Sequence, residues 1–517
     1  MSNTKIIAKN TGWYGLENII SALVTLFTSV AIARTLGPSK MGYLIYVAVI
    51  ASFVASLGSL GIPATTQKYM AEFLGMSDQG TARYIYFKTL WLQVGLSVLA
   101  TTGITIWVLG DASNGYKLAS VLIVLSILPS MINSIPAQAN VATEELQYNL
   151  PASVISILVF FVAILATAIF NWGVIGYGAS VLLTRLVDCL VRFIPTTARI
   201  ARWPKAHVEP YGLPQRMMTF AWQSIATMIL AMVVWDRSEF ILLKHLCSDI
   251  RQIAFYSVAF SMAERLLITS AVFGSAAGAT IFAQYGRDKS RLPAITAASF
   301  RYLALSSIPV HFIAVSLAFP VLLVFYGKQY AGAAMVVTLA PLLCMPKAFI
   351  GPVQNLLQSC ERQKYVIWAT VLAGIVDLSV AWLLIRRGHG AVGACLGSGA
   401  AQVTAVGTMW VIAIRMYHIK MPWWQTAKIT LISVIASAVA HFASVPFAPL
   451  WGVIIGGTAA LATLLVLFYL LRVLEPEDHA RLVVLAGMLP ARLAAPVHKI
   501  IAVLMRAELA NPTPSNV

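Results

Sequence analysis

Charge is scarce in this chain of 517 residues, because Asp, Glu, Lys and Arg make up 11% of it while hydrophobic residues make up 59%. Apolar runs of about twenty residues recur from Trp13 to Arg472, and each can cross a hydrocarbon core of ~30 Å as a helix. Runs such as Ile155–Ile169 are apolar on every face, whereas the strands of membrane barrels alternate. We therefore expect an all-α, polytopic membrane protein with about 14 transmembrane helices. The predicted spans are 13–33, 43–64, 87–109, 118–139, 151–170, 173–195, 219–243, 252–281, 302–325, 333–358, 365–385, 391–414, 426–446 and 450–472.

Motifs for covalent or metal chemistry are missing as well. The five cysteines stand singly in or beside apolar runs, a pattern typical of buried thiols and not of metal or redox sites. No GxxxxGK[ST] phosphate loop and no HExxH motif occurs, so ATP-driven transport and metalloprotease chemistry are not predicted. The outer loops are short, and the third holds only Asp111 as an acid. The sequence therefore predicts neither an enzyme nor a bound cofactor.

The charges that do occur are mostly positive and give a net charge of +17. With a cytoplasmic N-terminus, most Lys and Arg fall in the even-numbered loops and the termini, as at Arg199, Arg202 and Lys205. Membrane proteins concentrate basic residues on the cytoplasmic side, so both termini are predicted to lie there. In such a protein the positive charge predicts attraction to anionic lipid headgroups, not to nucleic acid.

The longest connection between spans, near 196–218, is basic and proline-containing, and it separates six spans from eight. Beyond the last span, basic residues from Arg481 to Arg506 return to one helical face, which is typical of a helix lying on a membrane surface. The predicted organisation is an N-terminal lobe at 1–198, a cytoplasmic linker at 199–216, a C-terminal lobe at 217–418, two further spans at 419–474 and a cytoplasmic amphipathic tail at 475–517.

An internal repeat supports the division into two lobes. At one constant offset Glu144 aligns with Glu361, and no gap is needed to align the residues that follow. Two hairpins of similar composition would explain part of this agreement, but paired glycines in the same register argue for a true repeat. Repeats around a central site are the usual build of secondary transporters. The further aligned pairs include Tyr148 with Tyr365, Gly173 with Gly390, and Gly176 with Gly393.

Charged residues inside the predicted spans are the candidates for function, because each costs at least ~2.5 kcal/mol at the bilayer centre. Four of them are basic and come from both lobes. A cavity lined by these four would suit a phosphate or pyrophosphate, for which Arg offers a bidentate fork and Lys a point charge. The full set is Glu17, Arg185, Asp188, Asp236, Arg237, Glu239, Glu264, Arg265, Lys347 and Asp377.

Structural pairing is the alternative explanation for these charges. Arg185 and Asp188 are spaced i,i+3 and can pair within one helix. Glu17 can favour a helix N-terminus, while Glu239 and Lys347 can extend to a membrane interface. The repeat places uncharged Gln402 opposite Arg185, which favours a functional role for that arginine.

The acidic residues have a second possible role in ion coupling. A carboxylate that loses water in a cavity can exchange a proton or a sodium ion during transport. Trp235 is a candidate for stacking on a sugar ring, although packing is the commoner role of such aromatics. The candidates for ion coupling are Asp188, Asp236, Glu264, Asp377 and Glu17.

Several short stretches resemble one family of membrane transporters. The turn Ile32–Tyr43 reads IARTLGPSKMGY, and it is followed by LGSLGI at 57–62 and QKYMAE at 67–72. FYSVA at 255–259 and EPED at 475–478 complete the series. With these stretches the chain resembles the polysaccharide transporter family of oligosaccharide or O-antigen flippases, in the superfamily of multidrug antiporters and lipid II flippases.

This resemblance implies two six-helix lobes facing each other as a V, with two further C-terminal helices. It also implies alternating access driven by a cation gradient, with a polyprenyl-pyrophosphate-linked oligosaccharide moved from the cytoplasmic to the outer leaflet. Cavity positions vary within the family, so only Arg265, a basic residue on the eighth span, is carried over as a site residue.

The expected function is therefore a lipid-linked oligosaccharide flippase of a prokaryotic cytoplasmic membrane. Its expected partners are the lipid-linked glycan, membrane lipids, H⁺ or Na⁺, and the polymerase and glycosyltransferases of the same pathway. Three alternatives remain. They are a multidrug cation antiporter of the same fold, a membrane glycosyltransferase or ligase, and a scaffold subunit of an export complex.

Overall fold

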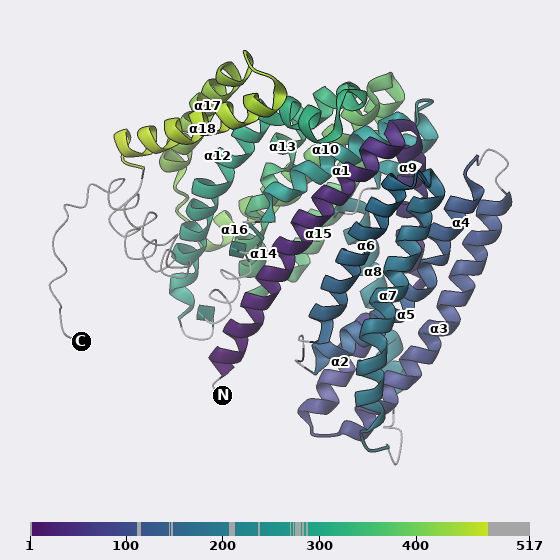
Figure 1. Ribbon diagram of the computed structural model, residues 1–517. Helices are drawn as coiled ribbons and strands as arrows, with labels where there is room; N and C mark the ends of the chain where they lie inside the picture. Colours follow the sequence, from purple (N-terminus) through teal and green to yellow (C-terminus); the bar gives the residue numbers. More distant parts are fainter. Residues whose placement is uncertain are drawn as a thin grey trace. The chain divides into compact units, whose positions relative to one another are not determined.

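The computed structural model describes residues 3–110, 115–143, 145, 148–205, 212–235, 238–268, 270–271, 273–274, 281, 284–285 and 288–473, with side chains from 28 onward except at 226–227 and 230–235. Within these ranges the chain is helical and contains no strand (Figure 1). Ten helical segments of the described part are long and apolar enough to cross a membrane. The predicted all-α, polytopic membrane fold is therefore confirmed, while the predicted tail at 475–517 lies outside the described residues.

The helices follow the predicted spans closely, and most differences are breaks inside a span or joins between two spans. In chain order they are α1 (Asn3–Gly58), α2 (Ile62–Gly75), α3 (Gln79–Gly110), α4 (Lys117–Leu125), α5 (Ile127–Ala142), α6 (Asn149–Ile169), α7 (Gly173–Ala201), α8 (Leu213–Trp235), α9 (Glu239–Leu246), α10 (Arg251–Leu266), α12 (Leu292–Tyr326), α13 (Ala334–Cys344), α14 (Ile350–Ser359), α15 (Gln363–Leu384), α16 (Gly390–Tyr417), α17 (Trp423–Ser444) and α18 (Pro449–Leu470), with short turns η2 (Lys289–Arg291), η3 (Lys328–Ala333), η4 (Met345–Phe349) and η5 (Ile385–His389).

One helix was not predicted. The second span was expected to continue to residue 64, but α1 ends at Gly58 and α2 begins at Ile62. Leu60 and Gly61 between them adopt left-handed backbone, with φ of 47° and 67°. A left-handed residue cannot continue a right-handed helix, so the chain turns here and α2 starts in a new direction.

The chain forms two compact units, each of which gathers segments from different parts of the sequence. Unit 1 contains residues 1–258, 326–333 and 370–401, and unit 2 contains residues 259–325, 334–369 and 402–517. These units group residues by their internal contacts and do not test the lobe boundaries expected from the sequence. Those boundaries stay a prediction.

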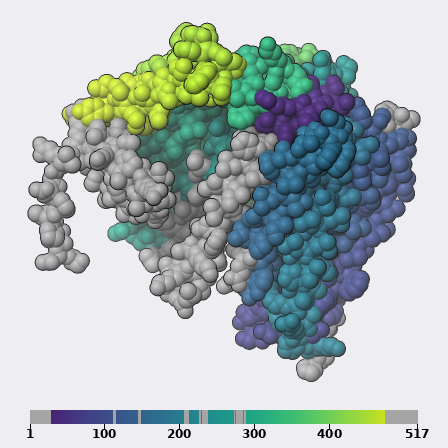
Figure 2. All heavy atoms as spheres, in the orientation of Figure 1, coloured from purple at the N-terminus to yellow at the C-terminus, as the bar shows by residue number. Residues whose placement is uncertain are grey.

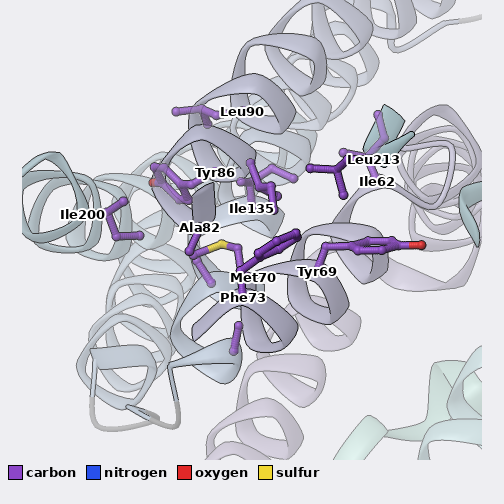
Figure 3. Packing of buried hydrophobic residues seen from close by; sticks show 13 residues of the cluster. Ile62, Tyr69, Met70, Phe73, Ala82, Tyr86, Leu90, Ile135, Ile200 and Leu213 are labelled. Carbon is purple, nitrogen blue, oxygen red and sulfur yellow. The ribbon is translucent and has the colours of Figure 1, made fainter. Parts of the chain in front are cut away.

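Unit 1 has an apolar core in which α2, α3, α5, α7 and α8 meet (Figure 3). Tyr86 is fully buried there, and its hydroxyl shares a hydrogen bond of 2.6 Å with Thr197 Oγ1 on α7. Tyr69 of α2 packs edge-on against Phe220 of α8, with ring centroids 6.2 Å apart. This core holds together helices from both ends of the predicted linker.

The sharp break inside α1 is a second feature of unit 1. Gly37 has φ 72° and ψ 169°, so the helix is interrupted and two carbonyl groups before the break lose their helical partners. Gln329 of η3 replaces those partners, because its Nε2 donates to the carbonyl oxygens of Ala33 at 3.0 Å and Arg34 at 3.3 Å. The IARTLGPSKMGY stretch thus forms a helix break that is capped by a distant segment.

Unit 2 packs α12 against α17 and α18. The buried residues Leu317, Ala440 and Ala460 form its apolar cluster, and Ser437 Oγ donates to the carbonyl oxygen of Phe312 at 2.7 Å. The surface of α17 and α18, yellow in Figure 2, exposes large apolar side chains such as that of Trp451. Exposed apolar surface of this kind fits contact with lipid.

The internal repeat is present in the backbone. The link between α6 and α7 and the link between α15 and α16 each contain a left-handed glycine at the aligned position, Gly173 with φ 57° and Gly390 with φ 46°. The next aligned pair, Gly176 and Gly393, lies in both cases against the end of the preceding helix, where a Cβ atom would clash. The two helical hairpins therefore share their turn geometry as well as their sequence.

Candidate functional site

A pair of buried acids lies inside unit 1. Asp377 of α15 is completely buried, and Glu239, the first residue of α9, is 2% exposed. Glu239 lies within interaction range of Asp377 and of the hydroxyl groups of Tyr256 and Ser398, while Ser238 approaches Asp377. Neither carboxylate oxygen of Asp377 completes a hydrogen bond among the described residues. Two acids thus meet in the interior of unit 1, and Asp377 lacks hydrogen-bond partners among the described residues.

This arrangement requires a positive charge or a proton. An isolated buried carboxylate is strongly disfavoured, and two carboxyl groups that share a site cannot both ionise without a counter-charge. No group of three or more His, Cys, Asp or Glu side chains that could hold a metal ion occurs in the described part of the chain. The pair can therefore carry a proton, or bind one cation with help from the neighbouring hydroxyl groups.

The alternative in which the Glu239 side chain extends to a membrane interface does not fit its burial, since the residue is 2% exposed. The helix that carries it is short and packed inside unit 1, with Phe240 against the ring of Tyr256 at a centroid distance of 5.1 Å. The packing of α9 against α10 turns Glu239 inward toward α15. A local pattern gives no hint of this, because Asp377 is far away in the sequence.

Arg185 of α7 lines a cavity of 330 Å³ within unit 1, here called the Arg185 cavity. The guanidinium group makes no ion pair with another described residue, and none of the described residues that line the cavity is acidic. Hydroxyl groups dominate the polar part of the lining. They come from Thr28, Ser52, Ser126, Ser130, Ser156, Tyr177 and Thr184.

Asp188 does not pair with Arg185, contrary to one expectation from the sequence. Its carboxylate lies 3.1 Å from Arg192 Nη2 in an i,i+4 pair, and it accepts a hydrogen bond of 2.7 Å from Asn133 Nδ2 of α5. Arg192 was not among the candidates, although the Asp-x-x-x-Arg spacing is a recognised helix-pairing signal. The pairing neutralises Asp188 and leaves Arg185 facing its cavity.

Three further candidates lie in unit 2. Glu264 and Arg265 lie in the last turn of α10, and Lys347 lies in η4. Glu264 and Lys347 both interact electrostatically with Cys344, whose Sγ lies 3.5 Å from the carbonyl oxygen of Ala263. The structure thus brings these two charges to one place within unit 2, and their proposed roles stay predictions.

Four candidates lie outside the described residues in whole or in part. Asp236 and Arg237 are not described, and Trp235 and Glu17 belong to α8 and α1 without described side chains. Their proposed roles in binding and coupling stay predictions from the sequence.

Comparison with known structures identifies the fold. The chain is similar to the lipid II flippase MurJ in an inward closed conformation, with a TM-score of 0.72 and 13% identity over 88% of this chain and 98% of that one. It is also similar to an inward-facing multidrug resistance transporter of the MATE family, with a TM-score of 0.63 and 13% identity over 77% and 94%. A MOP superfamily transporter from Pyrococcus furiosus, for which a reverse polarity of the binding pocket suggests a different function, gives a TM-score of 0.55 with 13% identity over 79% and 96%.

Sequence comparison gives the family. No curated protein sequence matches the chain. The family model for polysaccharide biosynthesis proteins matches residues 31–335, which is more than half of the chain. This chain, a multi-pass membrane protein with the fold of flippases and multidrug transporters, therefore belongs to the polysaccharide biosynthesis protein family.

Proposed function

We propose that this protein moves a polyprenyl-pyrophosphate-linked oligosaccharide from the cytoplasmic to the outer leaflet of a prokaryotic cytoplasmic membrane. The observation that carries this proposal is the Arg185 cavity, which combines one guanidinium group with several hydroxyl groups and holds no acid among the described residues of its lining. Such a lining favours an anionic, hydroxyl-rich headgroup, because Arg matches phosphate oxygens and hydroxyl groups match sugars.

The same lining argues against a multidrug cation antiporter. A cationic cargo would require an acid in the cavity, and the nearby Asp188 is already neutralised by Arg192. The family match to polysaccharide biosynthesis proteins also favours a glycan over a drug. Transport, and not glycosyl transfer, is supported by the fold similarity to flippases and transporters.

Energy for the movement is proposed to come from H⁺ or Na⁺ carried by Glu239 and Asp377. The two acids are buried together without a counter-charge among the described residues, so the site changes its charge when it gains or loses a cation. Binding of the cation can shift the equilibrium between two conformations of the transporter, by as much as its affinity differs between them. With both termini in the cytoplasm, the protein would take the glycan from cytoplasmic glycosyltransferases and deliver it to an outer polymerase.

The leaflet on which the lipid-linked glycan accumulates tests the proposed function. In a deletion strain, oriented vesicles treated with a membrane-impermeant glycan-modifying enzyme should show full-length glycan trapped on the cytoplasmic face. The wild-type gene and an Arg202→Ala variant, altered at an exposed arginine at the end of α7, should restore exposure on the outer face. Arg185→Ala should not restore it. Outer-face or truncated glycan in the deletion strain would instead indicate a polymerase, ligase or glycosyltransferase.

A further inference from the structure

A second cavity in unit 1 adjoins the first. It has a volume of 440 Å³ and is here called the Gln138 cavity. Ala55 and Ser130 line both cavities, so the two spaces abut along α1 and α5. Each volume falls in the range of about 300–1,000 Å³ that small-molecule sites span.

The Gln138 cavity is lined mainly by apolar groups, with uncharged polar side chains set among them. Among the described residues, its polar lining consists of five serine hydroxyl groups and one amide, and none of them is Asp, Glu, Lys or Arg. The polar residues are Ser56, Ser59, Ser130, Ser134, Gln138 and Ser224.

The hydrogen bonds within the described structure leave most of these side chains able to bind a ligand. Ser134 and Ser224 donate to carbonyl oxygens of their own helices, at 2.6 Å and 2.9 Å, so each hydroxyl oxygen keeps lone pairs for an incoming donor. Ser56, Ser130 and Gln138 make no side-chain hydrogen bond with another described residue. Ser59 already donates to the carbonyl oxygen of Ala55 at 2.7 Å and accepts from Gln93 Nε2 at 3.0 Å. The cavity therefore offers acceptors from the other serines, and Gln138 supplies an amide that both donates and accepts.

From this geometry we propose that the Gln138 cavity binds a neutral sugar residue of the transported glycan, while Arg185 in the adjoining cavity holds the phosphate group. A sugar presents many hydroxyl donors and acceptors and no charge, which matches a lining of hydroxyl and amide groups. The two abutting cavities would thus bind different parts of the headgroup, with the phosphate on one side of Ser130 and the uncharged sugar on the other. This inference rests on the proposed function and adds the class of sugar that the site accepts.

Binding of two synthetic probes to the purified full-length protein tests the proposal. One probe is a short-chain prenyl pyrophosphate that carries a neutral disaccharide, and the other is the same prenyl pyrophosphate without sugar. Wild type should bind the glycosylated probe at least tenfold more tightly. Ser224→Leu and Gln138→Leu should each remove this preference and leave the affinity for the sugar-free probe unchanged. Arg185→Ala should weaken the binding of both probes.

The matched control is Thr219→Leu. Thr219 lies on the same helix as Ser224, and its hydroxyl also donates to the carbonyl oxygen four residues earlier, at 3.0 Å, but it is exposed and lines neither cavity. This variant should keep the full preference for the glycosylated probe.

The outcomes separate the two proposals. Three outcomes would overturn the sugar subsite and leave the flippase proposal standing. Wild type could bind both probes with equal affinity, or Ser224→Leu and Gln138→Leu could keep the preference of wild type. In the third outcome, these variants would lose affinity for both probes equally. Failure of wild type to bind either probe would overturn the proposed function itself, and the sugar subsite with it.

Discussion

Gly42 lies directly against the carbonyl oxygen of Ile250, and a Cβ atom at position 42 would overlap that oxygen. The second half of α1 therefore touches the turn that precedes α10 at a point where only glycine fits. Near this contact, Tyr330 Oη lies 2.8 Å from Met41 Sδ. The glycine thus lets a segment of the IARTLGPSKMGY stretch approach residues far along the chain.

Replacing Gly42 with valine should separate these segments. We expect Gly42→Val to lower the free energy of unfolding by about 1–3 kcal/mol, as overpacking of a closed contact usually does. Thermal unfolding of the detergent-solubilised protein measures the change. Gly103→Val on α3 is the matched control, since nothing lies within 4 Å of a Cβ atom there. Equal stability of the two variants would contradict the tight contact.

Asp78 predicts a pH dependence at the start of α3. Its carboxylate accepts hydrogen bonds from Thr81 Oγ1 at 2.6 Å and Thr81 N at 2.9 Å, and these bonds hold the pKa of Asp78 below its usual value of 3.8. Because the folded-state pKa is the lower one, the stabilisation is present above the unfolded pKa and is lost as the pH falls through the folded pKa.

Asp78→Ala should therefore cost about 1 kcal/mol at neutral pH, as the loss of a helix-capping residue typically does. The difference from wild type should shrink as the pH falls below 3.8 and the wild-type carboxylate becomes protonated. Thermal unfolding of both proteins across this pH range measures it. A difference that persists at full protonation would show that the side chain acts by packing and not by its charge.

The acid pair predicts a response to cations. If Glu239 and Asp377 bind H⁺ or Na⁺, the cation stabilises the folded protein, by about 2.7 kcal/mol at a hundred times its Kd. Asp377→Asn should remove this response, because the remaining carboxyl group no longer faces a second acid. The melting temperature should then be insensitive to Na⁺ and to mild acidification, and flipping should be lost.

Asp288→Asn supplies the control for this prediction. Asp288 is an acid near the start of α12 that caps the turn at Ser290, and its replacement should leave both the cation response and flipping intact. A full sodium and pH response in Asp377→Asn would exclude the pair as the coupling site.

The fold could be predicted from the sequence because its signals are local. The length and hydrophobicity of the apolar runs identify the helices directly. The repeat seen in the sequence also extends to the backbone conformation, since Asn171 and its aligned partner Gly388 both have left-handed backbone, with φ of 54° and 90°. The early end of α1 could not be predicted, because it depends on Leu60 adopting a conformation that is unusual for a branched side chain.

The candidate site could be predicted only in part. Arg185 and Asp377 stood out because charge is rare within apolar spans. The partner of Asp377 could not be found in this way, since Glu239 lies near the end of a predicted span and only tertiary packing turns it inward. The sequence likewise could not show whether Asp188 pairs with Arg185 or with Arg192. Both spacings allow an ion pair within the helix, so the direction of the side chains decides.

The Asp188–Arg192 pair predicts opposite effects for two arginines on one helix. Both members of the pair are largely buried, with side chains 14% and 11% exposed. Arg192→Ala leaves Asp188 without its counter-charge, so it should lower the free energy of unfolding by about 3–5 kcal/mol. Arg185→Ala breaks no ion pair in the described structure, so it should leave stability nearly unchanged while flipping is lost.

The double variant Asp188→Leu/Arg192→Leu separates charge from packing. A buried ion pair can often be replaced by apolar residues at little cost, so the double variant should recover most of the stability that Arg192→Ala loses. Thermal unfolding of the four proteins gives the comparison. If the double variant is as unstable as Arg192→Ala, the stability depends on the hydrogen bond from Asn133 of α5 to Asp188 of α7, and not on the ion pair within α7. If Arg185→Ala proves as destabilising as Arg192→Ala, Arg185 is a structural residue and the cavity loses its proposed anion site.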